Sequence, residues 1–307
     1  MKASARPDLA GTFLPVTTPF DAVTGDIDVV AFGANLRHWF QSPIRGVLVA
    51  GTTGEGVLLD EGERRALLEA AADVLPEGAV LIAGTGAEST RHTLRQSCEA
   101  AESGADVVLV SPPAFFKGAM TPEALARHFR AVADDCPVPV LVYQVPLRMS
   151  TLDLPTALIG ELSRHPNIAG IKDSRGKLGL IGELVEHTSE DFQVLVGSGA
   201  LLLPALETGA VGGIVGVGLM ATDAAAEISV AYAAGRTAEA GRIQERIAPV
   251  HQRIVAEMGV PGVKAALDLM GLHGGAPRPP LAMRPEAGAD EIREILASAD
   301  IHSVAGV

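Results

Sequence analysis

Short apolar segments recur along the chain about every 25 to 35 residues, the length of one strand followed by one helix. Gly, Pro or Ser residues bound each segment, as expected for strands of a buried parallel sheet. Between them lie helix-length segments with apolar residues at a spacing of about 3.6. We predict eight strands, over residues 12–16, 46–50, 80–83, 107–110, 138–143, 169–172, 193–196 and 213–217.

The segment after the second predicted strand illustrates the helices. Asp60 followed three residues later by Glu63 is the pattern of a capping box, in which each residue satisfies a free backbone N–H of the other. Apolar residues then recur with the helical period from Ala66 to Val74. This pattern predicts a helix that begins just after Asp60.

Eight strands that are each followed by a helix close most simply as a (β/α)8 barrel, with a doubly wound open sheet as the alternative. Further helical patterns follow at 238–257, 263–270 and 290–297, with a connection rich in Gly and Pro at 273–280. We therefore predict a catalytic barrel over residues 1–234 and a C-terminal helical appendage over residues 235–307.

Composition supports this fold class. Hydrophobic residues make up 48% of the 307 residues and charged residues 20%, which allows a large core and argues against disorder. Because aromatic residues are only 4%, the core must consist largely of Val, Ile, Leu and Ala. These residues are typical of buried parallel strands and their covering helices, and they favour an α/β protein over an all-β sandwich.

Charge and cysteine usage restrict the partners and the compartment. The net charge is −13 and no cluster of Lys and Arg is present, which disfavours a nucleic-acid partner. Cys98 and Cys136 are the only cysteines, so a disulfide framework and a CxxC metal site are excluded.

Residues 1–11 lack the apolar core of a signal peptide, and the uncharged stretch at 208–222 is shorter than the ~18 residues of a membrane helix. We expect a cytoplasmic protein without a membrane partner.

Catalytic side chains of such barrels gather at the C-terminal ends of the strands. Among the five lysines, only Lys172 lies within a predicted apolar strand. Burial disfavours the charged ammonium and lowers the pKa of the side chain, which leaves a neutral amine able to attack a carbonyl. The alternative is a structural lysine that reaches out of the barrel rim or pairs with Asp173.

Two other strand ends carry groups that suit this chemistry. Tyr143 ends the preceding strand, and its phenol can transfer protons beside a Schiff-base lysine, although it can also be a packed aromatic cap. Gly51, Thr52 and Thr53 follow the second strand. Their backbone N–H groups and two hydroxyls can hold a carboxylate, and an ordinary glycine turn is the alternative.

Other catalytic motifs are missing from the sequence. Residues 216–221 match G-x-G-x-x-A, but they follow the last strand, whereas a dinucleotide site requires the first strand and helix. No P-loop, HExxH, GxSxG or EF-hand pattern is present, and the eight histidines lack metal-ligand spacing. We expect neither a metal nor another cofactor.

Three motifs at strand ends, GTTGE at 51–55 after the second strand, YxVP at 143–146 after the fifth and IKDS at 171–174 in the sixth, together resemble one family. It is the dihydrodipicolinate synthase and N-acetylneuraminate lyase family of pyruvate-dependent Schiff-base lyases, and the similarity extends to 259–271 and 277–281. The resemblance implies a (β/α)8 barrel in which Lys172 forms the Schiff base and Tyr143 is the catalytic tyrosine.

The resemblance also implies roles for the remaining candidates. Thr52 and Thr53 match the pair that holds the substrate carboxylate and joins the proton relay. Val215 falls where a backbone carbonyl of strand eight faces the site, and Arg148 matches the position that binds the carboxylate of the second substrate. A 2-oxo acid and an aldehyde are the implied substrates, and a homotetramer or dimer is the implied assembly.

The sequence departs from the synthases in a segment where they share Pro-Tyr-Tyr, whose second tyrosine joins a neighbouring subunit's relay. Here Phe115 and Phe116 follow Pro113 and Ala114, and phenylalanine cannot transfer a proton. Leu147 and Met149, which flank Arg148, also differ from the synthase pattern. The sequence therefore predicts a catabolic aldolase, such as a 4-hydroxy-2-oxoglutarate aldolase, which the tail at 271–281 and the KDS segment also resemble.

Several alternatives remain open. Within the family they are dihydrodipicolinate synthase itself and an aldolase or dehydratase of 2-keto-3-deoxy sugar acids. A phosphate-handling barrel isomerase without a covalent intermediate would use the glycine turns at 197–199 and 216–218 as its anion site. A protein that binds a 2-oxo acid without turning it over is the last alternative.

Overall fold

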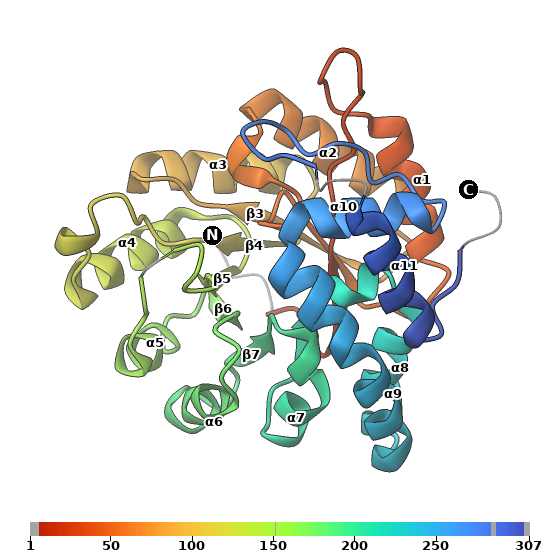
Figure 1. Ribbon diagram of the computed structural model, residues 1–307. Helices are drawn as coiled ribbons and strands as arrows, with labels where there is room; N and C mark the ends of the chain where they lie inside the picture. Colours follow the sequence, from red (N-terminus) through yellow and green to blue (C-terminus); the bar gives the residue numbers. More distant parts are fainter. Residues whose placement is uncertain (1–5, 151, 284–286, 304–307) are drawn as a thin grey trace.

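Eight parallel strands form a closed barrel in the computed structural model, which describes residues 6–150, 152–283 and 287–303 (Figure 1). Each strand pairs with the next one in sequence, and the last pairs with the first. The prediction of eight strands in a barrel is confirmed. The strands are β1 (Gly11–Pro15), β2 (Gly46–Val49), β3 (Val80–Thr85), β4 (Val107–Val110), β5 (Val140–Gln144), β6 (Ile168–Asp173), β7 (Gln193–Val196) and β8 (Gly212–Ile214).

One helix follows each strand and covers the outside of the barrel (Figure 1). The capping box is confirmed, because Asp60 accepts a hydrogen bond from the Glu63 N–H while the Glu63 carboxylate accepts one from the Asp60 N–H. The eight helices are α1 (Val29–Trp39), α2 (Glu61–Val74), α3 (Thr90–Glu102), α4 (Pro122–Asp135), α5 (Thr156–Leu162), α6 (Leu178–His187), α7 (Leu202–Glu207) and α8 (Thr222–Ala233).

The predicted C-terminal helices are also present. They are α9 (Thr237–Val250), the π-helix η5 (His251–Met258), α10 (Gly259–Leu269) and α11 (Ala287–Ser298), and they lie together beside α8. Pro249 lies inside α9 just before the π-helix. Proline lacks the N–H that continues the α-helical ladder, so it favours a wider turn at this point. None of the described helices is long and apolar enough to cross a membrane.

The core has two shells because successive side chains of a strand point to opposite faces. Inside the barrel lies a cluster that includes Phe13, Leu48, Ile82, Leu141 and Leu195, all fully buried. A larger cluster fills the space between the strands and the helices. Truncating one of these large side chains to Ala lowers the free energy of unfolding by ~2–5 kcal/mol, because the core is closely packed. A closely packed barrel supports the groups at its rim.

An irregularity between β5 and β6 determines which way Lys172 points. The pairing shifts after Val140, so that Tyr143 lies opposite Lys172. Ile171 then packs in the outer core, while its neighbour Lys172 lines the interior cavity. A shift of the pairing by one residue would turn Ile171 toward the cavity and Lys172 toward the outer core.

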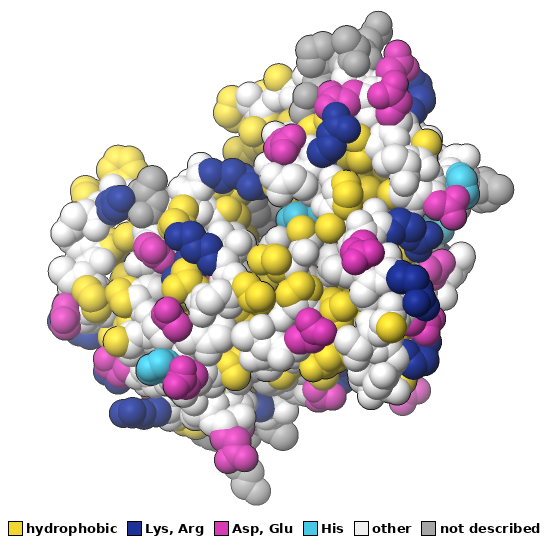
Figure 2. Space-filling model, turned by 60° about the horizontal axis from the view of Figure 1, so that its bottom comes forward, with side chains coloured by type: hydrophobic (Ala, Val, Ile, Leu, Met, Phe, Trp, Pro, Cys, Tyr) yellow, Lys and Arg dark blue, Asp and Glu magenta, His cyan; other side chains and the backbone are white. Residues whose placement is uncertain are grey.

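The charged groups are mixed on the surface. On the face shown in Figure 2, basic and acidic side chains are interspersed, and the surface is hollowed between two raised parts. This face therefore carries no large area of a single charge.

Candidate active site

A cavity of about 420 Å³ opens at the C-terminal ends of the strands. Residues from β5, β6 and β8 and from the loops after β2, β5, β6 and β7 line it, and the C-terminal helices complete its wall. The predicted residues Thr52, Thr53, Tyr143, Arg148 and Lys172 all line this cavity. Residues on both sides of position 235 contribute, so the division into a catalytic barrel and a separate appendage stays a prediction.

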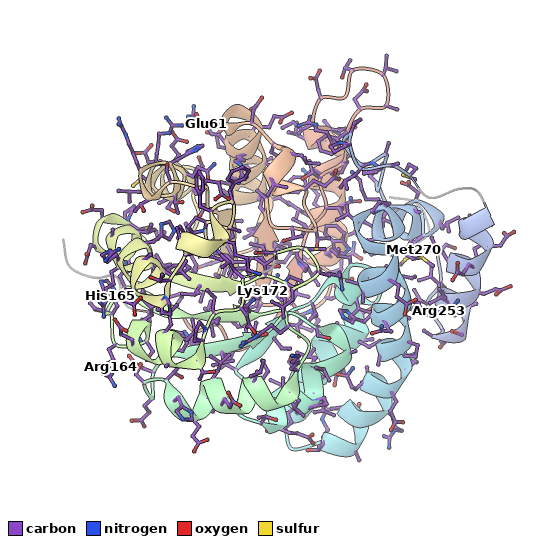
Figure 3. The ribbon with its side chains drawn as sticks, turned by 60° about the vertical axis from the view of Figure 1, so that its left-hand side comes forward. Glu61, Arg164, His165, Lys172, Arg253 and Met270 are labelled. Atoms are coloured by element: carbon purple, nitrogen blue, oxygen red, sulfur yellow. The ribbon has the colours of Figure 1, made fainter. Side chains whose placement is uncertain are left out.

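Lys172 lies inside the barrel, among the strands (Figure 3), and is only 5% exposed. Its Nζ is 4.8 Å from the centre of the Tyr143 ring. Burial lowers the pKa of Lys172 from 10.5 to about 7. A large fraction of the amine is therefore neutral near pH 7, as a nucleophile toward a carbonyl requires.

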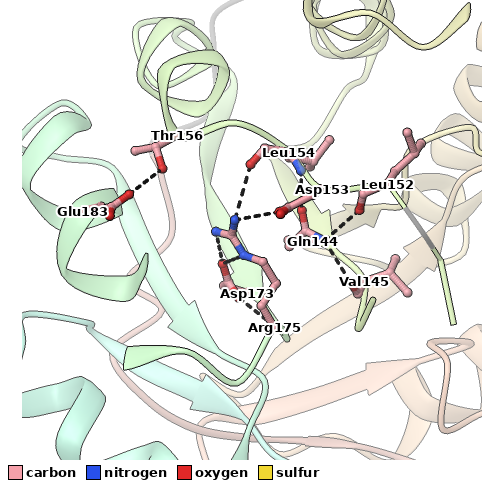
Figure 4. Close-up of polar contacts among 9 residues, drawn as sticks. All are labelled: Gln144, Val145, Leu152, Asp153, Leu154, Thr156, Asp173, Arg175 and Glu183. Atoms are coloured by element: carbon pink, nitrogen blue, oxygen red, sulfur yellow. Dashed lines mark hydrogen bonds and ion pairs between the residues drawn. The ribbon is translucent and has the colours of Figure 1, made fainter. Parts of the chain in front are cut away.

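Asp173 pairs with Arg175 (Figure 4) rather than with Lys172, the alternative that the sequence had left open. The Asp173 carboxylate accepts hydrogen bonds from the Arg175 backbone N–H and from Arg175 Nε, both at 2.8 Å. Arg175 also forms an ion pair with Asp153 at 2.9 Å. Asp173 thus has a cation of its own and leaves Lys172 without a carboxylate partner among the described residues.

The Tyr143 hydroxyl is 3.2 Å from Thr52 Oγ1, and the two groups share a hydrogen bond. Burial raises the pKa of Tyr143, and the hydroxyls of Thr52 and Ser174 oppose this effect. The phenol therefore stays protonated at neutral pH and is placed to donate or return a proton beside Lys172. Thr53 lines the same cavity, and it is the Thr52 hydroxyl that contacts the phenol.

The loop that carries Thr52 and Thr53 is tightly constrained. Ala50 and Glu55, on either side of it, both have positive φ values of 54° and 56°. Such conformations cost ~1–3 kcal/mol for residues other than glycine and persist only where the surroundings impose them. A side chain at Gly56 would overlap the Ala50 carbonyl oxygen, so that position must be glycine. Gly51 does not line the cavity, and its carbonyl accepts a hydrogen bond from the Gly56 N–H.

A buried ion pair holds this loop to the C-terminal helices. Glu55 Oε1 is 2.7 Å from Lys264 Nζ, and both side chains are fully buried. Lys264 also donates to the carbonyls of Thr18 and Ala276, and the Arg278 N–H donates to Glu55 Oε2 at 2.7 Å. Sequence reasoning missed this pair, although a lone lysine in the apolar helical segment at 263–270 was a signal for it.

Arg148 lies at the mouth of the cavity on the exposed loop after β5. Its positive charge opposes the rise in the pKa of Tyr143 and adds to the lowering of the pKa of His251. Within the described residues it has no hydrogen-bond or ion-pair partner. The loop itself is fixed at both ends, because the Gln144 amide bonds to Val145, Leu152 and Leu154 (Figure 4).

The expectation for strand eight needs a correction. Val215 does not line the cavity: its side chain is buried in the outer core, and its carbonyl accepts a hydrogen bond from the Gly218 N–H. Ile214 and Gly216 line the cavity instead. The strand ends at Ile214, whose side chain points inward, so the next residue points outward and enters a 3-10 turn.

Sequence reasoning also missed polar residues that line the cavity. Ser174 was visible in the IKDS motif, and Ser198 in a glycine turn that was considered only for phosphate. His251, which belongs to the π-helix, carried no signal in the sequence. The Phe115 and Phe116 rings are 79% and 66% exposed on the loop after β4 and do not line the cavity.

Comparison with known proteins agrees with this geometry. The model of the dihydrodipicolinate synthetase family matches residues 8–299. A probable mitochondrial 4-hydroxy-2-oxoglutarate aldolase of Emericella nidulans is 36% identical over 94% of this chain and 94% of its own length. A 4-hydroxy-tetrahydrodipicolinate synthase of an Exiguobacterium species is 33% identical over 88% of this chain and 91% of its own length.

Solved structures show the same fold. The chloride-inhibited dihydrodipicolinate synthase of Acinetobacter baumannii, solved with pyruvate, superimposes with a TM-score of 0.90 at 27% identity, covering 95% of this chain and 99% of the other. The match thus extends over the barrel, the strand ends that carry the cavity, and the C-terminal helices. On these grounds the chain belongs to the dihydrodipicolinate synthetase family and is an enzyme of this group of lyases.

Proposed function

We propose that this enzyme is a Schiff-base aldolase that cleaves a 4-hydroxy-2-oxo dicarboxylic acid, such as 4-hydroxy-2-oxoglutarate, to pyruvate and a carboxylated aldehyde. The observation that carries the proposal is the buried Lys172, whose pKa is lowered to about 7, beside Tyr143 in a cavity that Arg148 also lines. The amine supplies the nucleophile, the phenol moves protons, and the guanidinium recognises the second carboxylate.

The reaction begins when neutral Lys172 attacks the C2 carbonyl of the substrate. The resulting carbinolamine loses water and becomes an iminium, whose positive charge attracts electrons. Tyr143, linked to Thr52, donates its proton to the hydroxyl that leaves as water, and the phenolate so formed then accepts the proton of the C4 hydroxyl. The C3–C4 bond then breaks, its electrons pass to the iminium to form an enamine, and the aldehyde leaves. Protonation at C3 and hydrolysis release pyruvate and restore the amine.

The C1 carboxylate of the substrate is assigned to the loop after β2. Thr52 and Thr53 place two hydroxyls at the cavity, and hydrogen-bond donors of this kind hold an anion without a cation. The fixed backbone around Ala50 and Glu55 supports this assignment, because a rigid loop loses little entropy on binding.

Arg148 favours a dicarboxylate substrate. An unpaired guanidinium at a cavity mouth binds a carboxylate in a bidentate manner. Phe115 and Phe116 favour an aldolase over the synthase, since neither ring carries the hydroxyl that the synthase relay uses. The similarity to the Emericella protein points the same way, and the Exiguobacterium synthase makes dihydrodipicolinate synthase activity the second candidate.

Trapping with sodium borohydride tests the mechanism. Treatment in the presence of pyruvate should add the mass of one reduced pyruvate, located on the peptide that contains Lys172. The Lys172→Arg variant should remain unmodified. Unchanged intact mass of the folded wild-type protein would overturn the Schiff-base mechanism.

A substrate screen tests the specificity. Release of glyoxylate from 4-hydroxy-2-oxoglutarate should exceed both the cleavage of 2-keto-3-deoxy sugar acids and the condensation of pyruvate with aspartate semialdehyde. Faster condensation than cleavage would make the protein a synthase instead.

We also propose that the enzyme acts in the cytoplasm as a homotetramer or dimer. The exposed Phe115 and Phe116 rings, in edge-to-face contact at 5.1 Å between ring centres, support association through the loop after β4. Light scattering should give two or four chains per particle, and cell fractionation should recover the activity with cytoplasmic markers. A monomer in solution would refute the assembly.

A further inference from the structure

The loop after β7 is clamped by two residues of the C-terminal helices. Gln244 in α9 donates from Nε2 to the Gly199 carbonyl at 2.9 Å and accepts the Leu203 N–H at 2.9 Å. His251, at the start of the π-helix, accepts the Gly199 N–H at Nδ1 at 3.2 Å. These contacts fix the position of Ser198, which lines the cavity.

The protonation of His251 follows from this geometry. Since Nδ1 accepts the Gly199 N–H, the proton of a neutral ring must sit on Nε2. Burial, with a smaller contribution from Arg148, lowers the pKa of His251 to about 4, so the ring is neutral near pH 7. Nε2 lies 3.2 Å from Ser198 Oγ, and it is therefore the donor in that hydrogen bond.

The direction of this bond leaves one proton without a partner. Ser198 Oγ accepts from His251, so its own hydroxyl proton is available to another acceptor. Among the described residues no oxygen or nitrogen accepts it. Since Ser198 lines the cavity, an oxygen atom of a ligand in the cavity is the acceptor that fits.

The glycine between the two groups makes the arrangement possible. A Cβ at Gly199 would lie 2.5 Å from Val217 Cγ1 and 3.2 Å from His251 Nδ1. A larger residue at this position would therefore clash with Val217 and crowd the imidazole. Gly199 is therefore needed for the contacts with His251 that orient Ser198.

Arg148 identifies the chemical nature of the acceptor. Arg148, Ser198 and His251 line the same cavity, and Arg148 brings a positive charge to it. An acceptor that suits both a cation and a hydroxyl donor is an anionic oxygen. In the proposed reaction Lys172 bonds to C2 and the loop with Thr52 holds the C1 carboxylate, which leaves the distal carboxylate for Arg148 and Ser198.

We propose that Ser198 donates a hydrogen bond to the distal carboxylate of the substrate, next to Arg148, and that His251 is the positioning residue that turns the Ser198 hydroxyl toward it. This inference rests on the proposed function for the identity of the substrate. It adds a second recognition element for the carboxylate that leaves with the aldehyde.

Binding of two analogues that lack the C4 hydroxyl, and therefore cannot be cleaved, tests the proposal without turnover. 2-Oxoglutarate carries the distal carboxylate, and 2-oxopentanoate has the same chain length without it. Calorimetry should show that the wild-type protein prefers 2-oxoglutarate and that Ser198→Ala lowers this preference about tenfold, the loss expected for one hydrogen bond to a charged group. Ser103→Ala is the matched control, because its hydroxyl bonds to the Glu99 carbonyl in α3, away from the cavity.

Two substitutions separate positioning from general structure. His251→Gln retains an acceptor for Gly199 and a donor for Ser198, and it should keep most of the preference. His251→Leu should lose it about as far as Ser198→Ala, and the double variant should lose little more. Pyruvate trapping at Lys172 checks that each variant is folded.

An unchanged preference in Ser198→Ala would overturn the role of Ser198, and an unchanged preference in His251→Leu would overturn that of His251. A wild-type protein that traps pyruvate but binds both analogues equally would refute the carboxylate subsite alone. Failure of the wild-type protein to trap pyruvate would refute the proposed function instead, while the two analogues still report on the subsite.

Discussion

Lys264 Nζ lies 2.7 Å from Glu55 Oε1 in the interior, and this contact joins helix α10 to the loop that carries Thr52 and Thr53. The Lys264 ammonium donates all three of its hydrogen bonds, to Glu55 and to two backbone carbonyls. The position of the reactive loop thus depends on a residue more than two hundred positions further along the chain.

Removing one partner of this pair should destabilise the protein strongly. Lys264→Met and Glu55→Gln each leave a buried charge without its opposite charge, and each should lower the free energy of unfolding by ~3–5 kcal/mol. Urea denaturation followed by circular dichroism measures the change. Arg293→Ala, which removes an exposed ion pair with Asp290, is the control and should cost less than ~1 kcal/mol. Equal effects of the buried and exposed substitutions would contradict the argument.

Formation of the pyruvate adduct should increase with pH through about 7. The neutral amine of Lys172 is the nucleophile, and the pKa of Lys172 is lowered to about 7. About a tenth of the amine is then neutral at pH 6 and about nine tenths at pH 8. The initial rate of borohydride trapping at fixed pyruvate, corrected for borohydride decay, measures this dependence. A midpoint near the ordinary value of 10.5 would show that the amine is not desolvated.

Lys172 should also reduce stability at neutral pH. Between about 7 and 10.5 the unfolded chain binds a proton at this lysine that the folded protein does not bind, so the free energy of unfolding rises with pH across this window. Lys172→Met removes the titrating group. The variant should therefore be more stable than the wild-type protein by a few kcal/mol below pH 7, and this difference should shrink toward pH 10.5. Thermal unfolding at several pH values measures it.

The same comparison with Lys117→Met, a substitution at an exposed lysine, should show no such trend. A difference between Lys172→Met and wild type that does not change with pH would reflect packing alone.

The two tyrosines provide a matched pair for the proton transfer. Tyr143→Phe keeps the ring and removes the hydroxyl, and it should lower kcat for cleavage by about 100-fold to 10,000-fold. Tyr232→Phe removes a hydroxyl that bonds to the Leu206 carbonyl outside the cavity and should leave kcat within about twofold. Steady-state cleavage assays compare the two. Similar rates in both variants would assign the proton transfer to another group.

Arg148 should determine the choice of substrate more than the formation of the adduct. Arg148→Ala removes the charge at the cavity mouth, and it should lower kcat/KM for a dicarboxylic substrate about 10-fold to 100-fold, as expected for a lost charged contact. Trapping of pyruvate should change far less. Arg148→Lys should recover part of the loss because it restores the charge without the bidentate geometry. An equal loss in cleavage and trapping would make the role of Arg148 structural.

The sequence by itself determined the features that depend on neighbouring residues. The period of the apolar positions identified the eight strands and the C-terminal helices, and Asp60 with Glu63 marked a helix start, because strand pleat and helix caps are local properties. Lys172 and Tyr143 were found because both stand at the ends of adjacent apolar strands and lie in motifs that together resemble one family.

Only the tertiary structure decided how distant groups meet. The contact of Thr52 with Tyr143 and that of Ser198 with His251 join segments 91 and 53 positions apart, and no local pattern encodes such separations. Ile214 rather than Val215 lines the cavity because β8 ends at Ile214. This boundary depends on the pairing of β8 with β1 and β7. Closure of the barrel, which brings all strand ends to one rim, is the physical reason that these residues share a single cavity.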